Sequence, residues 1–134
     1  MSQDGPDADI IRTLFVGLSA GDYDDVARLL AEEVELDTPY APKGYFSNLA
    51  GRERVMDALT GLGDTFERIV LEVDTTYPSV GGETIVVEYH SNGTVKRNGK
   101  AYANRYVGIF RFRDGAIALW REYYNPDILR SAFS

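Results

Sequence analysis

The sequence predicts an α+β fold in which a curved antiparallel sheet wraps around helices that come first in the chain. Apolar residues recur at helical spacing in the first half of the sequence, and from residue 67 onward they alternate with polar residues as in strands. A length of 134 residues, with 44% hydrophobic and 26% charged side chains, is typical of one globular unit. We therefore expect a single domain over residues 1–134.

Three helices are expected before residue 63. The first carries apolar residues that share one helical face and precede Gly21, namely Ile10, Ile11, Leu14, Phe15 and Leu18. Asp22 can cap a second, short helix with Val26 on its apolar face. The third helix is expected over Arg52–Leu62, because Gly63 follows it.

Strands are expected after the second helix and again after the third. Val34–Thr38 alternates with period two and leads into a loop rich in proline and aromatic residues. Turn residues separate four longer strands: Glu67–Tyr77, Thr84–Ser91, Lys100–Arg113 and Ala116–Tyr124. Asn125 and Pro126 fit the start of a terminal helical turn.

The strand Lys100–Arg113 has an aromatic face that we expect to point toward the helices. That face carries Tyr102, Asn104, Tyr106, Gly108, Phe110 and Phe112. The Asp114-Gly115 turn allows two registers, with Phe110 opposite Leu119 in a two-residue loop or opposite Ala118 in a three-residue loop. We favour the second register because it places Trp120 and Glu122 on the aromatic face, with Glu122 opposite Tyr106.

The neighbouring strand carries a possible acid and base. Glu88 and His90 share one side of Thr84–Ser91, and the pattern leaves open which side lines a pocket. If they face inward, they join Glu122 and the phenols of Tyr102 and Tyr106. His90, the single histidine, titrates near neutrality, and a carboxylate such as Glu122 acquires a raised pKa in apolar surroundings. On the outside, Glu88 and His90 are ordinary surface groups.

Other candidate site residues come from the short strand and the loop after it. Asp37 is a possible second carboxylate, although the pattern by itself favours a solvated position for it. Tyr40 and Phe46 either cover a pocket or fill the core. Asn104 and Trp120 lie on the expected inward face and are candidates for substrate contact.

Composition excludes several classes of function. Fourteen Lys and Arg against 21 Asp and Glu give a net charge of −7, which argues against nucleic acid or an anionic membrane surface as a partner. Without cysteine and with one histidine, the chain has no disulfide and no thiolate or histidine-rich metal site, so we expect no cofactor. Met1–Asp9 lacks the features of a leader, and the sequence predicts a cytoplasmic protein.

The segment Asn104–Arg130, NRYVGIFRFRDGAIALWREYYNPDILR, resembles the SnoaL-like polyketide cyclase group of the nuclear-transport-factor-2-like superfamily. The helix-first order of the chain extends this resemblance over nearly its whole length. The resemblance implies a cystatin-like cone or half-barrel with a deep pocket for a small molecule, usually in a homodimer.

Three branches of the superfamily can be compared with this sequence. The phenazine-biosynthesis A/B proteins carry a similar R-E-aromatic-x-N-P run, so Glu122 looks like their catalytic acid and Tyr102 like their pocket tyrosine, whereas their helix histidine falls on Ala58. In limonene-epoxide hydrolases Glu122 matches one catalytic acid, but their Arg-x-Asp pair falls on Glu88-x-His90. Ketosteroid isomerase would place its base at Asp37, yet its oxyanion-holding Asp falls on glycine 108.

Residues and resemblance together predict a cofactor-independent cyclase or isomerase of secondary-metabolite or antibiotic biosynthesis. It would use general acid/base catalysis on a small apolar oxygenated intermediate, by intramolecular epoxide opening to a cyclic ether or by polyketide ring closure. Glu122, His90, Tyr102 and Asp37 are the expected catalytic residues. The expected substrate contacts are Tyr40, Phe46, Glu88, Asn104, Tyr106 and Trp120. The alternatives are an epoxide hydrolase of the limonene-epoxide type and a non-catalytic ligand-binding or accessory dimer.

Overall fold

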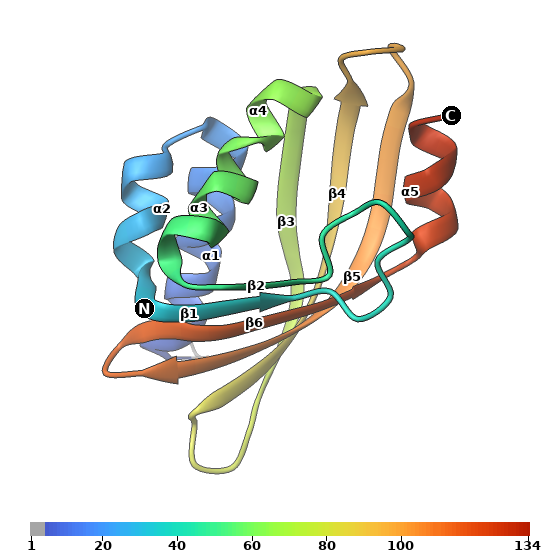
Figure 1. Ribbon diagram of the computed structural model, residues 1–134. Coiled ribbons are helices and arrows are strands. Elements are labelled where there is room, and N and C mark those ends of the chain that lie inside the picture. The colour runs from blue at the N-terminus through green and yellow to red at the C-terminus, as the bar shows by residue number, and fades with distance from the viewer. Residues whose placement is uncertain (1–4) are drawn as a thin grey trace.

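Six strands form one sheet in the order β2-β1-β6-β5-β4-β3 in the computed structural model, which describes residues 5–134 (Figure 1). The helices are α1 (Pro6–Ala20), α2 (Tyr23–Leu29), α3 (Arg52–Thr60), α4 (Leu62–Thr65) and α5 (Pro126–Ala132). The strands are β1 (Leu30–Asp37), β2 (Asn48–Ala50), β3 (Phe66–Pro78), β4 (Thr84–Val95), β5 (Ala101–Arg113) and β6 (Ala116–Tyr124). Helices that precede a curved sheet confirm the predicted α+β class. Met1 to Asp4, part of the segment in which a leader was sought, lie outside the described residues.

The order of elements agrees with the sequence, and the differences concern their ends and pairing. The expected third helix is divided into α3 and α4, strand β4 continues to Val95, and β2 was not predicted. Strand β1 pairs in parallel with β6, with Leu36 opposite Trp120, so the sheet is not antiparallel throughout. A hairpin turn forces two strands to be antiparallel, and no such turn joins β1 to β6.

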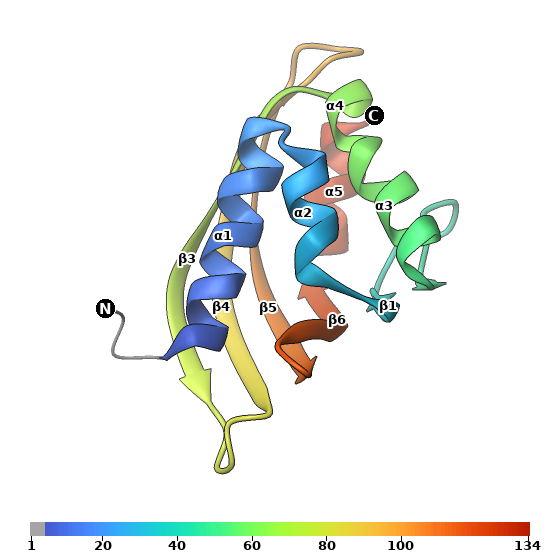
Figure 2. The same ribbon diagram turned by 90° about the vertical axis from the view of Figure 1, so that its left-hand side faces the viewer.

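Helices α1, α2 and α3 lie on one side of the bent sheet, and α5 packs beside the first residues of β5 (Figures 1 and 2). The apolar stripe of α1, which includes Leu14 and Phe15, is fully buried against this concave side. Gly21 ends α1 with a left-handed backbone of φ 77°. The Asn125 side chain accepts hydrogen bonds from the backbone N–H groups of Asp127 and Ile128 and so caps α5, as the sequence predicts.

The register of β5 and β6 differs from both expected alternatives. Asp114 and Gly115 form a two-residue loop with positive φ at both positions, and Arg113 pairs with Ala116. A bulge then inserts one extra residue into β6 between Ile117 and Leu119, so Phe110 lies opposite Trp120. The predicted pairing of Phe110 with Leu119 or Ala118 is therefore wrong.

The bulge nevertheless produces the predicted face. Trp120 and Glu122 lie on the aromatic side of the sheet, but Glu122 is opposite Gly108 and not opposite Tyr106. Tyr106 pairs instead with Tyr124. One extra residue in a strand shifts all later pairs, which is why turn length alone does not determine the neighbour of Glu122.

No helix in the described part of the chain is both long and apolar enough to span a membrane.

Candidate active site

A cavity of about 470 Å³ lies between the concave face of the sheet and helices α3, α4 and α5. Its wall is mainly apolar and includes Leu59, Phe66 and Ile69. Among the described residues Glu122 is the only carboxylic acid in this wall, and no Lys, Arg or His lines it. The volume is in the range of pockets that hold small organic ligands.

The carboxyl group of Glu122 is held by one hydrogen bond inside this cavity. Its Oε1 atom accepts this bond from the Tyr89 hydroxyl. Within residues 5–134, Oε2 has no hydrogen-bond partner, and it is left for a ligand. Removal from water raises the pKa of Glu122 to about 7, although the hydrogen bond from Tyr89 partly lowers it. Near neutral pH this group can therefore both give and accept a proton.

Tyr89 fixes the orientation of Glu122, and the sequence analysis did not select it. Its ring is buried against those of Phe15 and Tyr106, with ring centroids 4.5 and 4.8 Å away. Its hydroxyl oxygen lies 3.1 Å from Nε1 of Trp120, which can only donate, so the Tyr89 proton is directed to Glu122. Burial raises the pKa of Tyr89 well above its ordinary value, and the phenol stays neutral.

Gly108 provides the space through which Tyr89 reaches from β4 across β5 to β6. A Cβ atom at position 108 would lie 2.9 Å from Cε1 of Tyr89 and 3.3 Å from its hydroxyl oxygen. Those distances are shorter than ordinary contacts, so any larger residue would displace the ring. The contact between Tyr89 and Glu122 thus depends on a glycine in the strand between them.

A second polar group in the cavity consists of hydroxyls on β4 and β5. The Tyr106 hydroxyl lies 2.8 Å from Oγ of Ser91 and 2.9 Å from the Tyr102 hydroxyl. Asn104 donates from Nδ2 to the Tyr102 hydroxyl at 3.0 Å. Burial raises the pKa values of Tyr102 and Tyr106, so both phenols remain proton donors.

The positions of several predicted site residues agree with the sequence analysis. Tyr102, Tyr106, Trp120, Glu122 and Phe46 line the cavity. Asn104 is buried and reaches the cavity only through its hydrogen bond to Tyr102. The structure therefore brings one carboxyl group and two phenols together.

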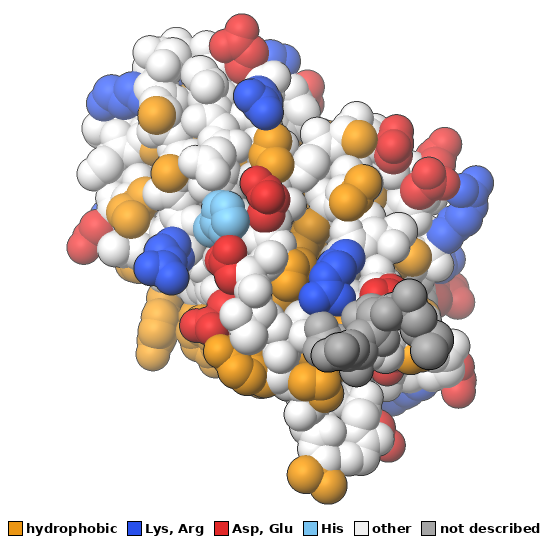
Figure 3. Space-filling view, turned by 180° about the vertical axis from the view of Figure 1, so that it is seen from behind, with side chains coloured by type: hydrophobic (Ala, Val, Ile, Leu, Met, Phe, Trp, Pro, Cys, Tyr) orange, Lys and Arg blue, Asp and Glu red, His pale blue; other side chains and the backbone are white. Residues whose placement is uncertain are grey.

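His90 and Glu88 were predicted as site residues, and this prediction is wrong because both lie on the outer face of β4. Ser91 and Tyr89 face inward on β4, so the residues that alternate with them point to the outer face. There His90 has its Nδ1 atom 2.8 Å from Asp74, and Glu88 accepts a hydrogen bond of 2.7 Å from the Tyr77 hydroxyl. Figure 3 shows the histidine on this surface beside acidic side chains.

Asp37 and Tyr40 also lie outside the cavity. Leu36 points into the cavity from β1, so its neighbour Asp37 points the other way and pairs with Arg121 at 2.8 Å. Tyr40 is 64% exposed and packs edge-on against Tyr123. The prediction of a second carboxylate in the pocket is therefore wrong for both Asp37 and Glu88.

The apolar content of the two sides of β4 was the signal that could have found Tyr89. Ile85, Val87 and Tyr89 form a purely apolar set, whereas the alternating positions include Glu88 and His90. A strand beneath helices buries its more apolar side. This comparison selects Tyr89 without knowledge of the turn that follows.

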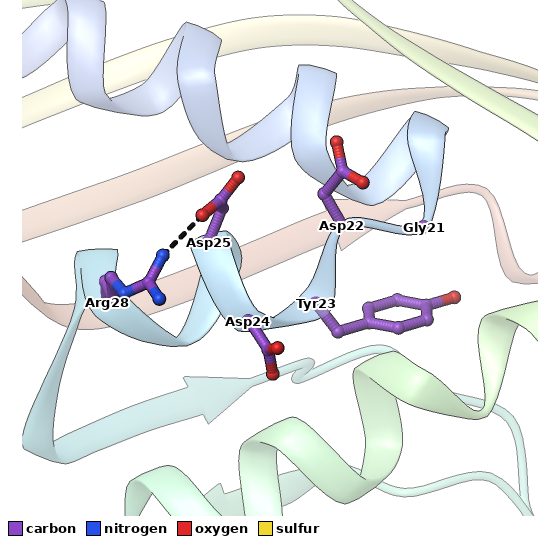
Figure 4. Close-up of a pocket in the computed structure, with 6 residues that line it drawn as sticks. All are labelled: Gly21, Asp22, Tyr23, Asp24, Asp25 and Arg28. Atoms are coloured by element: carbon purple, nitrogen blue, oxygen red, sulfur yellow. Dashed lines mark hydrogen bonds and ion pairs between the residues drawn. The ribbon is translucent and has the colours of Figure 1, made fainter.

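A separate depression of about 460 Å³ lies on the surface at the start of α2 (Figure 4). Asp22, Asp24 and Asp25 surround it, and Asp25 accepts a hydrogen bond of 2.5 Å from Arg28. Carboxylates in the first turn of a helix are stabilised by its N-terminal backbone charge, so these residues have a structural explanation. Within residues 5–134, no three His, Asp or Glu side chains come together in a way that could hold a metal ion.

Comparison with known proteins identifies the family to which the chain belongs. The family model described as a SnoaL-like domain matches residues 11–120. The chain belongs to the SnoaL-like family. The predicted resemblance to this group of the nuclear-transport-factor-2-like superfamily is confirmed.

Two similar proteins cover most of this SnoaL-like domain. PhzA/B-like protein PA3332 of Pseudomonas aeruginosa, itself uncharacterized, is 28% identical over 109 residues, which are 81% of this chain and 77% of that protein. A candidate isomerase from Bacillus subtilis has a TM-score of 0.90 at 24% identity, covering 99% of this chain and 96% of that one.

Two further solved structures are similar to the SnoaL-like domain in fold. A candidate polyketide cyclase from Xanthomonas campestris has a TM-score of 0.82 at 22% identity. The match covers 99% of this chain and 100% of the cyclase chain. An epoxide hydrolase from Mycobacterium tuberculosis, similar to the limonene type, has a TM-score of 0.75 at 19% identity, covering 96% and 90% of the two chains. At these identities the solved structures show the shared fold alone.

Proposed function

We propose that this SnoaL-like domain is a cofactor-independent cyclase or isomerase in which Glu122 carries a proton between two atoms of one small, apolar, oxygenated substrate. The observation that carries the proposal is the lone carboxyl group in an apolar cavity, with one oxygen held by Tyr89 and the other free. A pKa of about 7 supports it, because a group that is half ionised at neutral pH can serve as base and then as acid.

Ring closure of a polyketide-like substrate uses one carboxyl group twice. The Glu122 carboxylate takes a proton from a carbon next to a carbonyl group, and the resulting enolate carbon attacks a second carbonyl of the same molecule. A carbon–carbon bond forms, and the new alkoxide takes the proton back from Glu122. Atoms and charge balance, and the phenol of Tyr102, which is itself hydrogen-bonded to Tyr106, stabilises the developing oxyanion.

Intramolecular epoxide opening is a second chemistry that the cavity could support. The attacking hydroxyl and the departing epoxide oxygen lie on opposite sides of the carbon, so two protein groups are needed. Glu122 would take the hydroxyl proton, and the phenol of Tyr102 would protonate the epoxide oxygen. After the product leaves, transfer of the proton from Glu122 to the phenolate through solvent would restore both groups. Apolar walls disfavour competing attack by water.

An epoxide hydrolase is the first alternative, favoured by the fold of the hydrolase from Mycobacterium tuberculosis. It would have to activate water with Glu122 alone, because Glu88 and His90 lie on the outer face. A non-catalytic ligand carrier is the second alternative, since it needs the apolar cavity but no titratable group. We further propose that the protein acts as a homodimer in the cytoplasm.

Proton transfer can be tested without the natural substrate. The neutral bicyclic ketone 2-tetralone exchanges its acidic C–H protons with deuterium in D₂O, and NMR follows the rate. We expect the wild type to accelerate exchange and Glu122→Gln to lose about 100-fold or more of that acceleration. Glu88→Gln is the matched control, because it changes a Glu on the outer face, and it should exchange like the wild type.

Each outcome of this assay separates the proposal from its alternatives. No acceleration by the wild type, or equal acceleration by Glu122→Gln, would contradict the proposal and favour a carrier. A 4,5-epoxy alcohol incubated in ¹⁸O-labelled water distinguishes the two enzymes. An unlabelled cyclic ether supports the cyclase, whereas a labelled triol shows a hydrolase.

A further inference from the structure

The buried hydroxyl chain Ser91–Tyr106–Tyr102 has a direction that the surrounding donors and acceptors determine. Ser91, Tyr102 and Tyr106 are 1%, 5% and 8% exposed, so each hydroxyl proton needs an acceptor in the protein or in the cavity. The chain begins at Ser91 on β4 and ends at Tyr102 on the cavity wall.

Backbone groups fix the Asn104 amide at the Tyr102 end. The N–H groups of Arg105 and Asn125 donate to Oδ1 at 2.9 and 3.4 Å, and the carbonyl of Asn125 accepts from Nδ2 at 3.0 Å. The amide therefore cannot be reversed, and its Nδ2 group donates to the Tyr102 oxygen. Tyr102 is an acceptor in this contact, and its own proton goes elsewhere.

The Ser91 end decides where that proton goes. Oγ of Ser91 accepts from the Asn104 backbone N–H at 3.3 Å, and within residues 5–134 the Tyr106 oxygen, 2.8 Å away, is the one acceptor to which this hydroxyl is hydrogen-bonded. If Tyr102 donated to Tyr106 and Tyr106 to Ser91, the buried Ser91 proton would be left unpaired. The opposite direction satisfies Ser91 and Tyr106 and leaves the Tyr102 proton free.

We propose that Tyr102 donates its free proton to an acceptor oxygen of an uncharged ligand, so the cavity selects neutral ketones, esters or epoxides. This inference rests on the cavity being the substrate site of the proposed function. No cationic side chain lines the cavity among the described residues, and the Glu122 carboxylate repels anions. A ligand carboxylate would therefore lack a partner, whereas a neutral carbonyl oxygen would have one.

The experiment compares three probes that share one shape. They are 2-acetylnaphthalene, which carries an acceptor oxygen; 2-isopropenylnaphthalene, in which a CH₂ group replaces that oxygen; and the anion 2-naphthoate. Calorimetry at about pH 8.5 gives each Kd under conditions in which Glu122, with a pKa of about 7, is ionised and cannot donate. Any preference for the ketone must then come from another donor.

Tyr102→Phe should weaken binding of 2-acetylnaphthalene by about 3- to 10-fold and leave 2-isopropenylnaphthalene unchanged. Tyr124→Phe is the matched control, because Tyr124 lines the same cavity outside the hydroxyl chain. Ser91→Ala should keep the ketone preference, since Tyr106 still donates toward Tyr102. Thermal unfolding checks that each variant is folded.

Three results would overturn the inference: a ketone preference that survives Tyr102→Phe, one that is lost only in Tyr124→Phe, or naphthoate binding as tight as ketone binding. Because the readout is affinity, it is separate from proton exchange. Selective loss in Tyr102→Phe with no Glu122-dependent exchange would reject the proposed function and keep this inference. Glu122-dependent proton exchange together with unchanged ketone binding in Tyr102→Phe would keep the proposed function and reject this inference.

Discussion

Burial and a hydrogen bond have opposite effects on the pKa of Glu122. Burial in an apolar wall penalises the carboxylate and raises its pKa, and the Tyr89 hydroxyl stabilises the carboxylate and lowers it. Trp120 occupies the acceptor site of the Tyr89 oxygen, so Tyr89 can only donate to Glu122. Tyr89 is thus a positioning residue that holds Oε1 and leaves Oε2 to the ligand.

Tyr89→Phe removes the contact that favours the ionised form. The pKa of Glu122 should therefore rise above its value of about 7, because burial remains and the hydrogen bond is lost. Carbon-13 NMR of glutamate carboxyl groups, with Glu122→Gln for assignment, measures this titration. Tyr77→Phe is the control, since Tyr77 donates to Glu88 on the outer face and should not move Glu122. An unchanged or lower pKa in Tyr89→Phe would show that this phenol does not stabilise the carboxylate.

Three adjacent strands cooperate to build the site. Tyr89 on β4 passes over Gly108 on β5 and reaches Glu122 on β6. The bulge between Ile117 and Leu119 brings Glu122 opposite the glycine. The site therefore depends on strand register as much as on the identity of its residues.

Gly108→Ala tests this arrangement at the level of the strands. The added methyl group would lie 2.9 Å from ring atoms of both Tyr89 and Phe110, and these packed rings have little room to move. We expect a loss of about 1–3 kcal/mol in the free energy of unfolding, measured by urea denaturation. Val107→Ala is the control, because Val107 is the 39% exposed neighbour on the same strand and should cost less. Equal stability of Gly108→Ala and the wild type would mean that Tyr89 does not need this space.

Local patterns predicted the elements but not all their contacts. Periodicity placed the helices and long strands, and the aromatic face of β5 correctly indicated that Trp120 and Glu122 lie inside. The bulge has no turn residue that marks it, so the neighbour of Glu122 could not be predicted from Asp114 and Gly115. His90 attracted attention for its chemistry, although the apolar pattern of β4 favours the outer face for it.

At the scale of the whole molecule, the two faces of the sheet divide the polar groups. The concave face and its helices enclose one carboxyl group and several phenols. The outer face carries polar pairs, which include the hydrogen bond between His90 and Asp74 and the ion pair between Arg121 and Asp37. Apolar walls that reduce the contact of Glu122 with water also make its charge costly, so a chemically useful pKa and a penalty on folding have the same cause.

The sign of this penalty follows from the two pKa values. Glu122 has a pKa of about 7 in the folded protein against an ordinary value of 4.5, so between these values the folded state binds more protons than the unfolded state. The contribution of Glu122 to the free energy of unfolding is therefore largest below about pH 4.5, and it decreases as the pH rises to about 7. The full loss is about 3 kcal/mol.

The most direct test asks whether the Glu122 carboxyl group has a raised pKa in its apolar cavity. Urea denaturation gives the free energy of unfolding of the wild type and of Glu122→Gln from about pH 4 to pH 8.5, and the value for Glu122→Gln is subtracted from that of the wild type. Subtraction cancels the titration of the other carboxyl groups. This difference should fall by about 3 kcal/mol between about pH 4.5 and 7 and stay constant above pH 7. A difference that does not change with pH would show that Glu122 titrates like a solvated carboxylate, which contradicts its proposed role as a proton carrier.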